Sequence, residues 1–326
     1  MYINWVHQYV PPTFASLALA VNPVFIYLIF SEKVAILGNY RYLLLYFACF
    51  NLIYSTFVLL LPIAIHSYRY CFSIFTSDGH FLEASSLNLN LLIARCSLIA
   101  CSYAVLLSHF VYRYLAVKTS NYTGRKFPIF MLGSLILTSL FFGYGFAICA
   151  FGNSPAGKAY LRESYFKTHN IDSMKLNIIA AVFYEVPDGL EYRSYASIGL
   201  LTIQSVTSLT LFITLGTMTI RSINRLKFNM SDKTKILQRQ LMKALAIQTI
   251  IPIFISFSPC AVSWYSPIFN IDLGSGISNL EVNALATFPF CDPIAIILCI
   301  PVLRRQIFFR KKMIAIQRLD INTTFT

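Results

Sequence analysis

Apolar residues gather along this 326-residue chain into seven long blocks, separated by short charged or turn-forming stretches. A helix rises 1.5 Å per residue, so about 20 apolar residues cross a hydrocarbon core about 30 Å thick. Each block reaches that length. The predicted helices are 11–30, 42–65, 87–117, 127–151, 195–220, 236–271 and 280–303. The pattern therefore predicts an all-α membrane protein, with a seven-transmembrane helix bundle over residues 1–303.

Two amphipathic stretches accompany these blocks. Ser231 is a candidate N-cap, and apolar residues recur every three or four positions after it, so the sixth helix is expected to begin before its apolar block. The segment 304–326 mixes Phe, Met and Ile with six Lys or Arg residues. It is expected to form a helix on the anionic inner surface of the membrane, with a disordered basic tail as the alternative.

Composition agrees with a membrane protein. Charged residues make up 12% and hydrophobic residues 57% of the chain, whereas soluble domains carry about 25% charged residues. The net charge of +13 does not indicate a nucleic-acid partner, because apolar blocks separate the basic residues. No Lys or Arg precedes the first block, so we interpret it as a retained helix rather than a cleaved signal peptide. Membrane lipids are therefore expected to surround the protein.

The distribution of basic residues predicts the orientation. Lys and Arg number 19 in the segments after the first, third, fifth and seventh helices and 7 on the opposite side. Segments rich in Lys and Arg stay in the cytoplasm. We therefore expect the N-terminus and the long loop 152–194 outside the cell, and the C-terminal tail inside.

Three ionisable residues stand out inside the blocks: Arg95, Arg113 and Asp292. Charged groups are costly in a membrane and usually serve function. The chain has no HExxH motif, no paired CxxC spacing and no Ser-His-Asp arrangement, and the seventh block has no Lys to anchor retinal. The sequence predicts no catalytic site, no metal site and no cofactor.

Prolines and polar residues inside the blocks predict bends and a buried polar layer. Pro289 and Pro293 flank Asp292, and each proline removes one helix hydrogen bond and frees a carbonyl group. Asn22, Asn51 and Asp292 lie about 15–18 Å above the nearest basic residues on the inner side, Lys33, Arg41 and Arg304, at 1.5 Å per residue. Polar groups at one depth are expected to turn inward and share hydrogen bonds, with water between them. In the sixth helix, kinks are expected at Pro252 and Pro259.

Four strings of the sequence resemble one family across nearly the whole chain. They are LGNYRYLLLYFACFNLIYS (37–55), HSYRYCFSIFTSDG (66–79), SHFVYRYLAV (108–117) and FPFCDPIAIILCIPVLRRQI (288–307). As a set they are similar to the nematode serpentine chemoreceptors, most closely class J of the Str group. The resemblance implies a rhodopsin-like G-protein-coupled receptor that detects a small odorant or pheromone. It also implies a heterotrimeric G protein as partner and a place in the plasma membrane, in sensory-neuron cilia.

The resemblance also implies roles for single residues. Arg113, between Tyr112 and Tyr114, matches the arginine with which rhodopsin-like receptors hold their helices closed and meet the G protein. The alternative is an anchor that extends to lipid phosphates. Because Tyr112 replaces the acid usual at that position, any restraint at rest must come from elsewhere. Arg95 either faces a ligand cavity, where it would attract an acidic ligand, or extends to headgroups.

Disulfide pairing must differ from the pattern of rhodopsin-like receptors. Those receptors tie the third helix to the second outer loop, but residues 152–194 contain no cysteine. Cys71 with Cys96 or Cys149 is the remaining candidate, because all three are expected near the outer face.

Two other classes compete with a receptor. A seven-helix transporter of the three-plus-one-plus-three kind requires the first three helices to resemble the last three. Asn22-Pro23 and Asp292-Pro293 stand in the first and seventh blocks, which do not correspond in such a repeat. An odorant-gated cation channel of the insect kind would place the N-terminus inside, against the charge distribution. The receptor interpretation is preferred.

Overall fold

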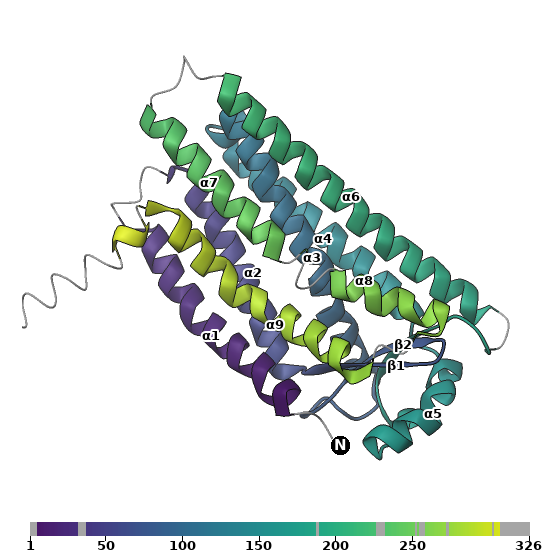
Figure 1. Ribbon diagram of the computed structural model, residues 1–326. Coiled ribbons are helices and arrows are strands. Elements are labelled where there is room, and N and C mark those ends of the chain that lie inside the picture. The colour runs from purple at the N-terminus through teal and green to yellow at the C-terminus, as the bar shows by residue number, and fades with distance from the viewer. Residues whose placement is uncertain are drawn as a thin grey trace, which may run out of the picture.

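The structure is a computed structural model that describes residues 5–31, 37–186, 189–225, 232–251, 253, 258–271, 274–301 and 303–306. Its long helices run side by side in one bundle (Figure 1). They are α1 (Trp5–Ile29), α2 (Tyr40–Leu60), α3 (Ser86–Val117), α4 (Phe127–Phe151), α6 (Leu190–Arg225), α7 (Asp232–Ile251), α8 (Ser258–Tyr265) and α9 (Gly274–Cys299). Six of them, all but α7 and α8, are long and apolar enough to cross a membrane. The predicted membrane-spanning bundle is thereby confirmed.

The sixth predicted helix differs from expectation. The range 236–271 was predicted as one helix, but the structure has α7, then α8, then a 3-10 turn over Ser266–Phe269. Pro259 is the second described residue of α8, and residues 252 and 254–257 lie outside the described part of the chain. The kinks predicted at Pro252 and Pro259 therefore stay predictions.

One end of the bundle carries a small antiparallel sheet, and we call it the sheet end (Figure 1). Strands β1 (Ile63–Tyr68), β2 (Cys71–Thr76) and β3 (Ile178–Val182) pair in the order β1-β2-β3. The prediction that the second helix continues to residue 65 was wrong. Pro62 disfavours helical backbone at the residue before it, and Leu61 has left the helix with φ −131 and ψ 74.

The loop 152–194 contains β3 and a helix, α5 (Pro155–His169), neither of which was predicted. Ser154 caps α5 by accepting a hydrogen bond from the Gly157 N–H at 2.9 Å, and Pro155 stands at the first helical position. The buried residues Leu161 and Tyr165 of α5 pack under the sheet with Phe75. The sheet end therefore has its own small core.

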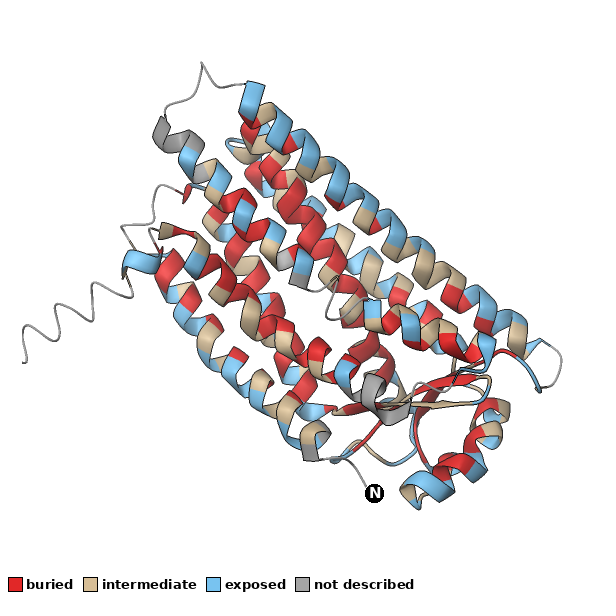
Figure 2. Ribbon diagram, viewed as in Figure 1, coloured by how far each residue is buried: buried red, intermediate tan, exposed pale blue. Residues whose placement is uncertain are grey.

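Burial identifies α3 as the central helix. In its membrane span 78% of residues are buried, against 17% in α4 and in α6. Exposed apolar side chains such as Leu140 of α4 and Ile213 of α6 lie on the outside, where lipid replaces water as solvent (Figure 2). Several polar groups of α3, among them Arg95, His109 and Arg113, therefore lie in the protein interior.

Candidate functional site

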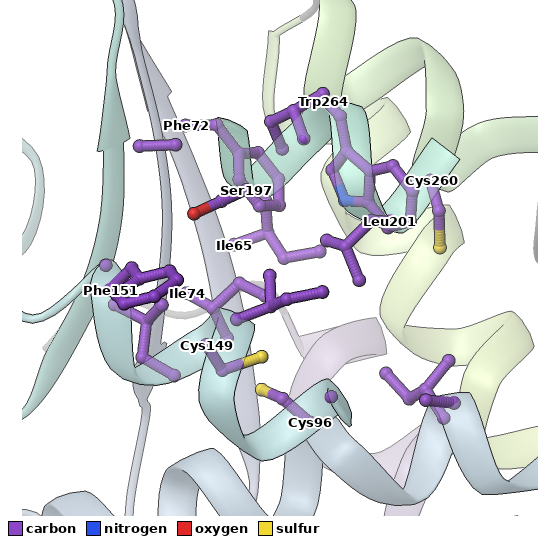
Figure 3. A pocket seen from close by; sticks show the side chains of 18 of the residues that line it. Ile65, Phe72, Ile74, Cys96, Cys149, Phe151, Ser197, Leu201, Cys260 and Trp264 are labelled. Carbon is purple, nitrogen blue, oxygen red and sulfur yellow. The ribbon is translucent and has the colours of Figure 1, made fainter. Parts of the chain in front are cut away.

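A narrow cavity of about 100 Å³ lies between the sheet and the helices α3, α4, α6, α8 and α9. Figure 3 shows its wall, which is mostly aliphatic and aromatic, with Ile65, Phe72 and Ile74 contributed by the strands and Trp264 by α8. We call this space the apolar cavity. Apolar walls with a few polar groups are typical of small-molecule sites.

Two polar side chains in the apolar cavity have atoms without partners among the described residues. Both amide atoms of Gln204 and Oε2 of Glu281 are buried and make no hydrogen bond there. The carboxyl group of Glu281 faces Cys260 and Ser263 of α8. Glu281 was not among the predicted site residues, although it lies inside the predicted span 280–303. In the structure its side chain is only 2% exposed.

A second cavity of about 490 Å³ opens at the sheet end among α1, α2, α3, α9 and the segment after β2. Its apolar wall includes Pro12, Val58 and Ala286, and its charged residues are Arg95 and Asp78. We call it the arginine cavity. The Arg95 side chain is 2% exposed, with its guanidinium carbon 4.3 Å from the ring centre of Tyr54. The interpretation of Arg95 as a residue that extends to headgroups was therefore wrong.

Below the cavities, two of the three residues of the predicted polar layer meet. Asn22 Nδ2 donates to the Pro289 carbonyl oxygen at 3.1 Å, and Asn51 Nδ2 donates to Asn22 Oδ1 at 3.5 Å. Pro293 has no N–H to offer the Pro289 carbonyl, so Asn22 satisfies an acceptor that the helix leaves free. Asp292 is buried, but among the described residues no hydrogen bond joins it to either asparagine. A water-bridged layer stays a prediction.

At the end of the bundle opposite the sheet, Arg113 is also 2% exposed. Its guanidinium carbon lies 3.4 Å from the ring centre of Tyr40 on α2, and Nη1 donates to Gln238 Oε1 on α7 at 3.3 Å. Tyr112 stacks on Tyr40 with ring centres 5.2 Å apart, whereas Tyr114 has its ring 6.0 Å from the Lys118 amine. Arg113 therefore links three helices and does not extend to lipid.

All eight cysteines are free, so Cys71 is joined neither to Cys96 nor to Cys149. Cys71 is buried on β2, and burial raises the pKa of its thiol. Cys96 of α3 and Cys149 of α4 instead face each other at the edge of the apolar cavity (Figure 3). The sequence predicts all three residues near the outer face, but no local pattern predicts that the strand turns Cys71 toward α5.

The chain is similar to known proteins over most of its length. Residues 1–307 match the family model described as serpentine type 7TM GPCR chemoreceptor Srj. The chain is 42% identical over 306 residues to serpentine receptor class J-38 of Caenorhabditis elegans, covering 93% of each chain. It is 28% identical to serpentine receptor class r-10 of the same species, covering 83% of this chain and 81% of the relative. With G-protein coupled receptor str-33 it shares 26% identity, covering 86% and 83%.

Proposed function

This chain belongs to the Srj family of serpentine seven-transmembrane chemoreceptors, and we propose that it detects a small molecule and activates a heterotrimeric G protein. It is a multi-pass membrane receptor of a family that is not an enzyme class. The sheet end faces outward and receives an odorant or pheromone. The Arg113 end faces the cytoplasm, with the receptor in the plasma membrane of sensory-neuron cilia.

The arrangement around Arg113 carries this proposal. The sequence lacks an acid beside Arg113, so a restraint on the resting state had to come from another helix. Gln238 supplies a hydrogen bond across the gap between α3 and α7, and Tyr40 supplies a cation–π contact from α2. Neither partner is as strong as a buried carboxylate would be. Movement of α7 away from α3 would release Arg113 and open the cytoplasmic end.

Two features support a coupling between the ends. The helix α9 contacts both cavities at the sheet end through Val282 and Leu285, and it receives the Asn22 hydrogen bond at Pro289. A ligand that favours one arrangement of α8 and α9 would shift the population at Arg113 by its differential affinity.

The proposal is tested in cells that express the receptor with a second-messenger reporter. A screen of small organic molecules is expected to give a response that disappears when coupling to G proteins is blocked, with no uptake of the active compound. Uptake without a second-messenger response would favour the transporter instead. An N-terminal tag should bind antibody on intact cells, whereas a C-terminal tag should need permeabilisation; the reverse result contradicts the orientation.

A further inference from the structure

The charge of Arg95 has no counter-charge in the structure. Nε and Nη1 of its guanidinium group are buried and make no hydrogen bond among the described residues. No ion pair joins it to a described acid, and Glu281 faces α8 in the apolar cavity instead. Burying a cation without an anionic partner is costly. The contact with the Tyr54 ring offsets that cost only in part.

The space beside Arg95 suits an anion with an apolar body. The arginine cavity is wide enough for a small organic molecule, and most of its wall is apolar. The acid on the same wall, Asp78, is exposed, and its Oδ1 accepts a hydrogen bond from the Gly79 N–H at 2.7 Å. Asp78 therefore does not neutralise Arg95, and its charge at the mouth disfavours ligands with two negative charges.

We propose that the arginine cavity binds a small aliphatic monocarboxylate, with its carboxylate against the guanidinium group of Arg95 and its chain along the apolar wall. This rests on the receptor function proposed above and names the chemical class of the ligand. A guanidinium group presents parallel N–H donors, on Nη2 with either Nε or Nη1, that match the two oxygens of a carboxylate. Binding supplies the counter-charge that the described part of the chain does not supply.

A short chain of contacts connects this site to the kinked helix α9. The Tyr54 ring under Arg95 lies 4.6 Å from the ring of Phe288, centre to centre. The next residue is Pro289, whose carbonyl oxygen accepts from Asn22. An anion that draws the Arg95 guanidinium group away from Tyr54 would loosen the contact of Tyr54 with Phe288. Phe288 is next to Pro289, whose carbonyl lacks a backbone hydrogen bond within α9. The site is thus placed to bias α9 as well as to hold a ligand.

The test measures binding without any G protein. Purified full-length receptor in detergent is heated with butanoate, hexanoate or octanoate, and with the alcohol and the amine of the same chain length. The midpoint of unfolding should rise with the carboxylates and stay unchanged with the alcohols and amines. Sodium chloride at equal concentration is the control for a simple anion effect.

Variants assign the effect to the cavity. Arg95→Gln should weaken the apparent carboxylate affinity at least about 30-fold, since removing one partner of a buried charge pair has an effect of that size. Ala286→Phe, which fills the cavity and keeps Arg95, should abolish the shift and serves if Arg95→Gln does not fold. Arg193→Gln, at an exposed arginine of α6 outside both cavities, is the matched control and should leave the shift unchanged.

The outcomes separate this inference from the proposed function. An equal shift with alcohols, with amines or with chloride overturns the carboxylate site, as does a shift that survives Arg95→Gln and Ala286→Phe. Carboxylate binding without any second-messenger response would instead count against the receptor function. A second-messenger response to other molecules, together with no carboxylate binding, would leave the receptor function standing and remove this ligand class.

Discussion

Arg95 and Arg113 lie near opposite ends of α3, about 27 Å apart at 1.5 Å per residue. Both are 2% exposed, and each lies over a tyrosine of α2, Tyr54 at 4.3 Å and Tyr40 at 3.4 Å. They differ in the second partner. Arg113 donates one hydrogen bond, from Nη1 to Gln238 of α7, and borders no cavity that Arg95 borders. Each arginine has two buried nitrogens without a hydrogen bond among the described residues, Nε and Nη2 in Arg113 and Nε and Nη1 in Arg95, but only Arg95 lines the arginine cavity.

This difference supports the two roles that we propose for the arginines of this helix. A buried arginine that is partnered within the protein acts as a link that motion must break. A buried arginine that borders an open cavity acts as a binding group that a ligand must complete. Gln238 of α7 meets Arg113, whereas residues of α1, α2 and α9 line a cavity beside Arg95.

The largest expected effect comes from removing Arg113 itself, because we propose that its guanidinium group meets the G protein once it is released. Arg113→Ala should reduce G-protein activation below detection while the amount of receptor at the cell surface stays largely intact. Arg113→Lys keeps the charge and loses the planar stack on Tyr40, so it should restore little activity. Reporter output normalised to surface staining measures both. Normal signalling by Arg113→Ala would show that its partners only stabilise the fold.

An intermediate effect is expected at Gln238. A hydrogen bond to a charged group contributes about 1.5–3 kcal/mol, so Gln238→Ala should raise the basal reporter output about tenfold. Gln238→Glu places a carboxylate opposite Arg113 and should lower basal output and raise the ligand concentration needed. The pair of opposite responses is diagnostic, because a change in expression alone would move both variants in one direction.

The smallest effect concerns how the sheet end is fastened to the bundle. The Gly152 carbonyl oxygen accepts a hydrogen bond from the Ala180 N–H at 2.8 Å, and a Cβ at Gly152 would lie 2.5 Å from Ile179 Cγ2. Gly152→Ala should therefore destabilise the purified receptor by about 1–3 kcal/mol. Gly133→Ala in α4 meets nothing within 4 Å and is the matched control. Equal melting midpoints for the two variants would contradict this packing.

Much of the site was open to prediction because it depends on depth in a membrane. The third and fourth predicted helices, 87–117 and 127–151, agree with α3 and α4 to within one residue. The level of Asn22 and Asn51 followed from counting 1.5 Å per residue, and the structure joins them. Glu281 could have been found by the same rule, since it lies inside an apolar block.

The remaining features depend on contacts between segments far apart in the chain. Ile63–Tyr68 is apolar enough to continue a helix, and it becomes a strand because Pro62 ends α2 and β2 and β3 offer backbone partners. In the sequence, Gln238 is one of several polar residues in a basic stretch. Only the packing of α7 beside α3 brings it to Arg113. Which arginine meets a partner and which meets a cavity depends on neighbouring helices that no local pattern specifies.

By itself, the sequence determined a membrane-spanning bundle, two of its helices to within one residue, and buried polar positions within it. It did so because a bilayer demands long apolar helices and penalises every charge inside them. The tertiary structure alone decided the sheet, the free state of the cysteines, the Arg113–Gln238 link and the two cavities. Those features depend on distances between side chains of different helices, and packing sets such distances only when the whole bundle is assembled.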